Sequence, residues 1–96
     1  MAHRSKLGIY YTILMRASNN ELVGITDYRL AALTGIKGFQ GRRYLEELND
    51  LGLITISHDY AERWKRSIVI TYAGKMVFAK LDNIKEDLKK SGLPSF

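Results

Sequence analysis

Residues 25–54 read ITDYRLAALTGIKGFQGRRYLEELNDLGLI, and this stretch decides the fold. Two short helical patterns meet at the T-G-I turn of residues 34–36. Gly35 suits the left-handed position that closes a helix, and Gly52 suits the same position after the second pattern. We therefore predict a helix-turn-helix over about residues 26–51.

Each helix of this pair is expected to bury one face and to begin at a recognisable residue. Thr26 suits an N-cap, since its hydroxyl can accept a hydrogen bond from a free amide of the first turn. The expected inward residues are Leu30, Ala31 and Leu33 in the first helix, and Gly41, Leu45 and Leu48 in the second. Gly38 and Gly41 lower helix propensity by about 1 kcal/mol each relative to alanine. The start of the second helix should therefore be firm only when it is packed or bound.

The flanking sequence predicts further helices and a hairpin. Ser5 suits an N-cap, and an apolar face that runs to about Ala17 indicates a first helix. Residues 22–25 form an extended stub able to pair with a later strand. Apolar residues alternate over 53–57 and again over 67–71, which is typical of half-buried strands. The nine residues between them form an extended tip. Thr71 would then cap a last helix over about 72–90.

The composition limits the class of protein. Ninety-six residues make one domain, 1–96, and the net charge of +5 with a pI of about 9.6 suits a polyanionic partner. With no cysteine there is no disulfide framework, and no apolar run is long enough to span a membrane. The N-terminus lacks the apolar core of a secretion signal. We expect a cytoplasmic, nucleoid-associated protein.

Three motifs carry a family resemblance: L-A-x-x-T-G-I over 30–36, Y-L-E-E-L-x-x-L-G-L-I over 44–54 and I-T-x-x-G-K over 70–75. Their order and spacing resemble small winged-helix DNA-binding proteins, namely MarR- and PadR-like regulators and the compact winged-helix proteins of archaea and their viruses. The resemblance implies an α+β, mostly helical fold: a winged helix-turn-helix with a two-stranded wing over about 53–71 and a long C-terminal dimerisation helix. The sequence differs from the family at the start of the recognition helix. Gly38, Phe39 and Gly41 stand there where serine or threonine is usual.

The second helix of the pair carries the first candidate DNA contacts. Arginine and glutamine can each form two hydrogen bonds to a base, and lysine at a helix start suits a phosphate. The candidates are Lys37, Phe39, Gln40, Arg42 and Arg43. An alternative is a solvated face on which Arg43 pairs with Glu46 or Glu47. For Phe39, which could contact a thymine methyl group, we favour packing over Tyr44 or the first helix.

The hairpin tip carries the second set. Cations around an aromatic ring suit the phosphate backbone or the minor groove. These residues are Arg63, Trp64, Lys65 and Arg66. The alternative is that Trp64 packs against its own wing or a partner subunit.

The last helix carries an apolar seam with heptad spacing. It consists of Val77, Leu81, Ile84 and Leu88. The seam could pack on the first helix of its own chain or pair with a second chain. Its sustained heptad and a length of roughly 27 Å favour pairing as a homodimer.

Catalytic and metal-binding patterns are missing from the sequence. There is no nucleophile elbow, no phosphate-cradling glycine loop and no plausible triad. His3 and His58 are far apart and no cysteine accompanies them, which argues against a metal site. We predict that the protein is not an enzyme and has no cofactor.

The resulting hypothesis is a homodimeric, sequence-specific protein that binds double-stranded DNA and regulates transcription. Two alternatives remain open at this point. One is an architectural DNA binder with little sequence preference, and the other is a winged helix that serves as a protein-interaction module.

Overall fold

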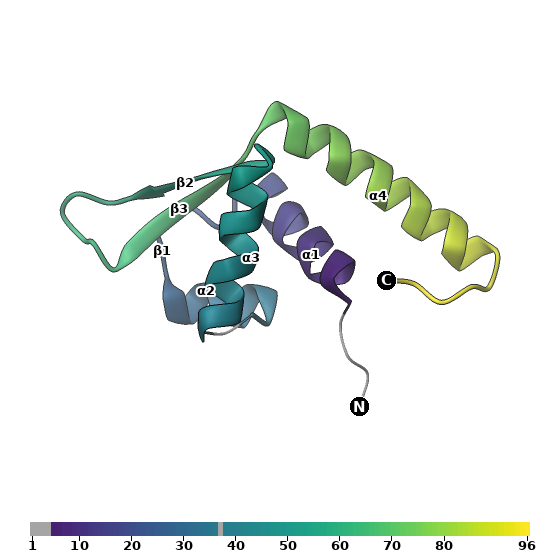
Figure 1. Ribbon diagram of the computed structural model, residues 1–96, viewed down its shortest axis with the longest axis horizontal. Helices are drawn as coiled ribbons and strands as arrows, with labels where there is room; N and C mark the ends of the chain where they lie inside the picture. The colour runs from purple at the N-terminus through teal and green to yellow at the C-terminus, as the bar shows by residue number, and fades with distance from the viewer. Residues whose placement is uncertain (1–4, 37) are drawn as a thin grey trace.

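The computed structural model describes residues 5–36 and 38–96, which form four helices and three short strands. In chain order they are α1 (Lys6–Ser18), β1 (Ile25–Thr26), α2 (Asp27–Thr34), α3 (Gly38–Asp50), β2 (Ile54–His58), β3 (Lys65–Ile70) and α4 (Tyr72–Lys90). Figure 1 shows the β2–β3 hairpin reaching out on one side and α4 extending on the other. The predicted order of elements and the winged-helix fold are confirmed.

The sheet is antiparallel, and its strand order is β1-β3-β2. The hairpin register places Ile54 opposite Ile70 and Ile56 opposite Ile68. The predicted stub does pair, because Ile25 lies opposite Arg66 and the Ile68 amide donates to the Leu22 carbonyl at 2.7 Å. The wing is therefore fastened to the body through β1, directly before α2.

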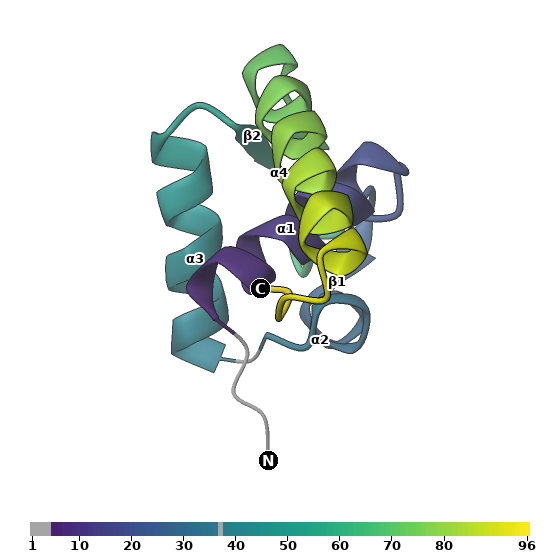
Figure 2. The same ribbon diagram turned by 90° about the vertical axis from the view of Figure 1, so that its right-hand side faces the viewer.

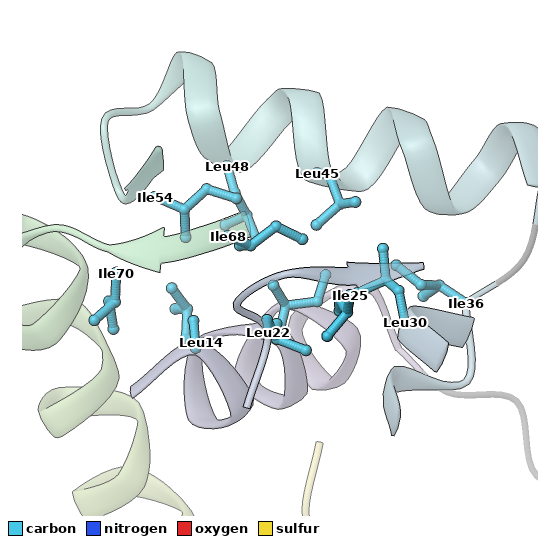
Figure 3. Close-up of a cluster of buried hydrophobic side chains, with 12 residues drawn as sticks. Leu14, Leu22, Ile25, Leu30, Ile36, Leu45, Leu48, Ile54, Ile68 and Ile70 are labelled. Carbon is cyan, nitrogen blue, oxygen red and sulfur yellow. The ribbon is translucent and has the colours of Figure 1, made fainter. Parts of the chain in front are cut away.

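The core lies where α1, α2, α3 and the sheet meet, and Figure 3 shows its apolar side chains converging from all of them. Ile13, Leu14 and Leu22 are fully buried at its centre, as is Leu48 of α3. Of the predicted inward residues of α2, Leu30 is buried, while Ala31 and Leu33 are half-buried.

The predicted helix boundaries follow from local hydrogen bonds. The hydroxyls of Ser5, Thr26 and Thr71 each accept a hydrogen bond from the amide three residues later, so all three N-caps are confirmed. Gly35 and Gly52 both have φ near +75°, which confirms the left-handed positions after α2 and α3.

Two parts of the sequence motifs, G-L-I at 52–54 and T-x-x-G at 71–74, meet at one joint. The Thr71 amide donates to the Leu53 carbonyl at 3.0 Å, and the Thr71 hydroxyl donates to the Gly52 carbonyl at 2.6 Å. A Cβ atom on Gly74 would lie 2.0 Å from the same Leu53 oxygen. The G-L-I and T-x-x-G motifs therefore fix where α4 leaves the wing.

The long last helix packs along α1 and is separated from α3, as Figures 1 and 2 show. Val77 and Leu81, which we assigned to a seam between two chains, pack instead against this chain's own core. Leu88 is half-buried, and Ile84 is 49% exposed. The inner side of the seam therefore packs against α1 and the core, and pairing of the seam with a second chain stays a prediction.

Candidate nucleic-acid interface

The outer face of α3 displays Phe39, whose side chain is 92% exposed. The prediction that Phe39 packs into the core is wrong. Ile36, only 6% exposed, already fills the space beneath the first turns of α3, and a Cβ on Gly41 would lie 3.1 Å from its side chain. Phe39 lies two residues before the buried Gly41, which places it on the opposite side of α3, so its side chain points to solvent.

The polar candidates on α3 are exposed beside Phe39. Gln40 donates from Nε2 to the Tyr44 hydroxyl at 3.0 Å. Arg42 is exposed and has no ion pair among the residues that the structure describes. Lys37 lies outside the described residues.

Arg43 is held only loosely. Its Nε lies 3.9 Å from a Glu47 carboxylate oxygen, and the Arg43 side chain is 80% exposed. The same carboxylate accepts a hydrogen bond from the Tyr10 hydroxyl and lies 2.9 Å from Lys6 Nζ. Because Glu47 is engaged by α1 and exposed ion pairs contribute little, Arg43 can leave Glu47 for another anion at small cost.

A cavity of about 140 Å³ separates the start of α3 from the wing strand β3. Arg42 lines it from α3, Arg66 from β3 and Asp27 from the start of α2. Arg66 Nη2 lies 3.0 Å from Asp27 Oδ1, and the Arg66 side chain is only 16% exposed. Arg42 of the recognition helix and the Arg66–Asp27 ion pair at the base of the wing therefore border one cavity.

The wing cations are less free than the sequence suggests. Lys65 Nζ lies 2.7 Å from Glu62, and the hydrogen bond to that carboxylate raises the pKa of Lys65 above its ordinary value. Arg66 is tied to Asp27. Arg63 is exposed and has no ion pair within the described part of the chain. Trp64 is 64% exposed, so its side chain is not buried against its own wing.

Sequence reasoning missed two residues of the wing tip. Tyr60 is 102% exposed, which is full exposure. Asp59 Oδ1 accepts hydrogen bonds from the Ala61 amide at 2.8 Å and the Glu62 amide at 3.0 Å. These bonds lower the pKa of Asp59 and hold the turn. The signal that could have revealed this turn is an aspartate two residues before its tip.

The described residues form neither a metal-binding cluster nor a membrane-spanning helix. Within residues 5–36 and 38–96, no group of three or more histidine, aspartate or glutamate side chains is arranged to hold a metal. No helix in this part of the chain has the length and apolar character needed to cross a membrane. His3 lies outside the described residues.

Solved structures with the same fold come from DNA-binding proteins. BpsR of Bordetella bronchiseptica, whose DNA binding is regulated by 6-hydroxynicotinic acid, aligns with a TM-score of 0.71 at 20% identity over 86% of this chain and 58% of its own. A MarR family transcriptional regulator from Silicibacter pomeroyi aligns with a TM-score of 0.67 at 26% identity over 85% and 54%. Sso10a-2, a DNA-binding protein from Sulfolobus solfataricus, aligns with a TM-score of 0.65 at 22% identity over 93% and 90%. No protein-family model matches the sequence, and the search of curated proteins found no match.

These alignments confirm the resemblance to MarR-type and compact archaeal winged-helix proteins at the level of the fold. The chain spans little more than half the length of the MarR-type structures that it matches. It spans nearly the whole of the Sulfolobus protein.

Proposed function

We propose that the protein is a homodimeric, sequence-specific binder of double-stranded DNA that regulates transcription. The observation that carries this proposal is the outer face of α3, the second helix of the helix-turn-helix, where Phe39, Arg42 and Arg43 are exposed together. A helix in this position can enter the major groove. The MarR-type and Sulfolobus structures that share the fold support the same reading.

In this proposal the recognition helix contacts bases and the wing contacts the DNA backbone. Arg42 and Arg43 can each present two donors to guanine or grip a phosphate, and Gln40 can read adenine after leaving Tyr44. Phe39 would contact a thymine methyl group or a sugar. Arg63 at the wing tip would contact the DNA phosphate backbone beside the site. It has no ion pair among the described residues that DNA binding would have to break.

The proposed dimer uses the outer side of α4. Ile84 and Met76 are 49% and 47% exposed, although both are apolar. A second copy that covers them would bring two recognition helices to half-sites about one DNA turn apart.

The decisive experiment is a double substitution on α3. Arg42→Ala with Arg43→Ala should weaken binding of a selected site by about 100-fold or more, because each well-placed arginine contributes about 1–3 kcal/mol of base discrimination. The matched control removes two exposed cations from α4, Lys75→Ala with Lys80→Ala, and should change affinity by only a few fold. Duplexes selected from a random pool supply the site, and electrophoretic shifts measure the affinity. Equal losses in both variants would show that α3 reads no sequence.

An architectural DNA binder of low sequence specificity is the alternative to a regulator. The chain spans 90% of the Sulfolobus DNA-binding protein but little more than half of the regulators, so its length fits a compact DNA binder as well. A regulator should prefer its site over random duplex by roughly 10³ or more, whereas an architectural protein should not. Competition between selected and random duplex at fixed salt separates the two. If no duplex is shifted even at low salt, the protein-interaction alternative replaces both.

A further inference from the structure

The wing tip exposes two aromatic rings that the fold does not use. Tyr60 is 102% exposed and Trp64 is 64% exposed, and neither belongs to the buried core or packs against it. Aromatic side chains of this size normally bury most of their area in a core or an interface. Their exposure on a projecting hairpin (Figure 1) indicates a surface that meets a partner.

The charges at the tip indicate what kind of partner fits. Lys65 pairs with Glu62 at the surface, and Arg66, only 16% exposed, pairs with Asp27. Arg63 is therefore the wing cation without an ion pair among the described residues. A tip built to hold phosphates would keep several cations free. This tip instead offers two rings and one free guanidinium, and a nucleobase with its phosphate is the group that such a set fits best.

The tip is also held in shape before it binds. Asp59 accepts from the amides of Ala61 and Glu62, and the Lys65 amide donates to the Glu62 carbonyl at 2.9 Å. The Asp59 amide closes the turn by donating to the Lys65 carbonyl at 3.2 Å. A preorganised loop loses little conformational freedom on binding, so ring stacking contributes more fully to affinity.

We propose that the wing tip is a base-stacking site, and that Tyr60 and Trp64 bind unpaired bases beside the duplex that α3 contacts. Inside a duplex, both faces of a paired base are covered by the bases stacked above and below it. An aromatic side chain can stack on such a base only if two neighbouring base pairs first separate, which costs energy. An unpaired base has a free face and needs no such opening. The inference rests on the proposed DNA binding and adds to it a preference for duplex that carries unpaired bases.

The test compares three DNA probes and uses Trp64 as its own reporter, since it is the chain's only tryptophan. The probes are a fluorescein-labelled duplex of about 24 base pairs, long enough for two half-sites one turn apart, the same duplex with a short flank of unpaired thymines, and that flank alone. The flanked duplex should quench Trp64 fluorescence and bind about tenfold tighter than the plain duplex, as expected for one or two stacked bases. Affinity is measured by anisotropy of the labelled DNA.

Matched substitutions separate stacking from simple apolar contact. Trp64→Leu and Tyr60→Leu should each remove most of the advantage of the flanked probe. Tyr60→Leu, at a residue outside the predicted duplex contacts, should also leave binding of the plain duplex nearly unchanged. Trp64→Phe keeps an aromatic ring and should retain most of the advantage. Tyr72→Leu, which changes a tyrosine 78% exposed on α4, should have no effect on any probe.

The three probes distinguish failure of the stacking site from failure of duplex binding. If the plain duplex binds but the flank adds nothing, the stacking site is overturned and the DNA-binding proposal stands. If the flank alone binds with quenching while the plain duplex does not, the stacking site stands and the duplex proposal falls. If no probe binds, both are overturned, and the exposed rings belong to a protein partner. The stacking site would also be overturned if Trp64→Leu bound the flanked duplex more tightly than the plain duplex by the same factor as the natural protein.

Discussion

Gly74 determines how closely α4 can approach the wing. A Cβ atom at this position would lie 2.0 Å from the Leu53 carbonyl oxygen and 2.7 Å from the Ile70 side chain. Gly74→Ala must therefore push α4 away from the joint, and we expect a loss of about 3 kcal/mol in the free energy of unfolding. Urea denaturation measures it. Helix propensity alone predicts the opposite sign, a gain of about 1 kcal/mol, so a stabilised variant would contradict this account of the joint.

Tyr11 couples the packing of α4 to pH. Its hydroxyl donates to Asp82 Oδ1 at 2.6 Å, and this hydrogen bond, followed by burial, raises the pKa of Tyr11 from 10.0 to about 12. The folded pKa exceeds the unfolded value, so this contribution to stability is complete below pH 10 and is lost as pH rises through 12. Between these limits the natural protein should lose roughly 2–3 kcal/mol more than Tyr11→Phe. Urea midpoints at several pH values measure the difference, and Tyr72→Phe, at an exposed position, should follow the natural protein.

The start of α3 is the element whose stability should respond to DNA. Gly38 has φ of +58°, and Gly41 follows within the first turn, so both lower the helical preference of this segment. We expect amide hydrogen exchange at residues 42–44 to be at least about tenfold faster than at 46–50 in the free protein, because local opening is easiest where packing is sparse. Adding DNA should slow exchange at 42–44 selectively. Uniform protection along α3 in the free protein would show that the helix is already rigid.

Elements whose boundaries depend on neighbouring residues could be predicted from the sequence. The caps at Thr26 and Thr71 and the left-handed turn at Gly35 involve atoms within a few residues of one another, so residue type alone indicates them. Phe39 could not be placed in this way. Its exposure depends on which face of α3 turns inward, and that face is set by the packing of Gly41 against Ile36 in three dimensions.

At the scale of the whole molecule, contacts between distant elements were beyond the sequence. The pair between Arg66 and Asp27 depends on the register of β3 against β1, which places Arg66 opposite Ile25. This ion pair leaves Arg66 less available to a partner than the other wing cations. The heptad of α4 likewise shows that one face is apolar but not which neighbour covers it. The fold divides that face between α1 and solvent.

The divided seam leads to a prediction about assembly. Ile84→Glu places a charge on a side chain that is 49% exposed, so the isolated fold should change in stability by no more than about 0.5 kcal/mol. If a second chain covers this side of α4, the same charge would be buried without a partner, and the dimer should dissociate. Sedimentation equilibrium of the natural protein and of Ile84→Glu measures the change, and Met76→Glu provides a second, independent position.

Leu81→Glu is the control that separates assembly from folding. Leu81 packs against the core within its own chain, so a glutamate there should cost several kcal/mol of folding stability, whatever the oligomeric state. A monomeric Leu81→Glu protein would therefore say nothing about pairing unless its fold were shown to be intact. A monomeric Ile84→Glu protein with an unchanged unfolding midpoint would locate the interface on the outer side of α4. If Ile84→Glu and Met76→Glu both remain dimers, the two recognition helices must be brought together by another surface.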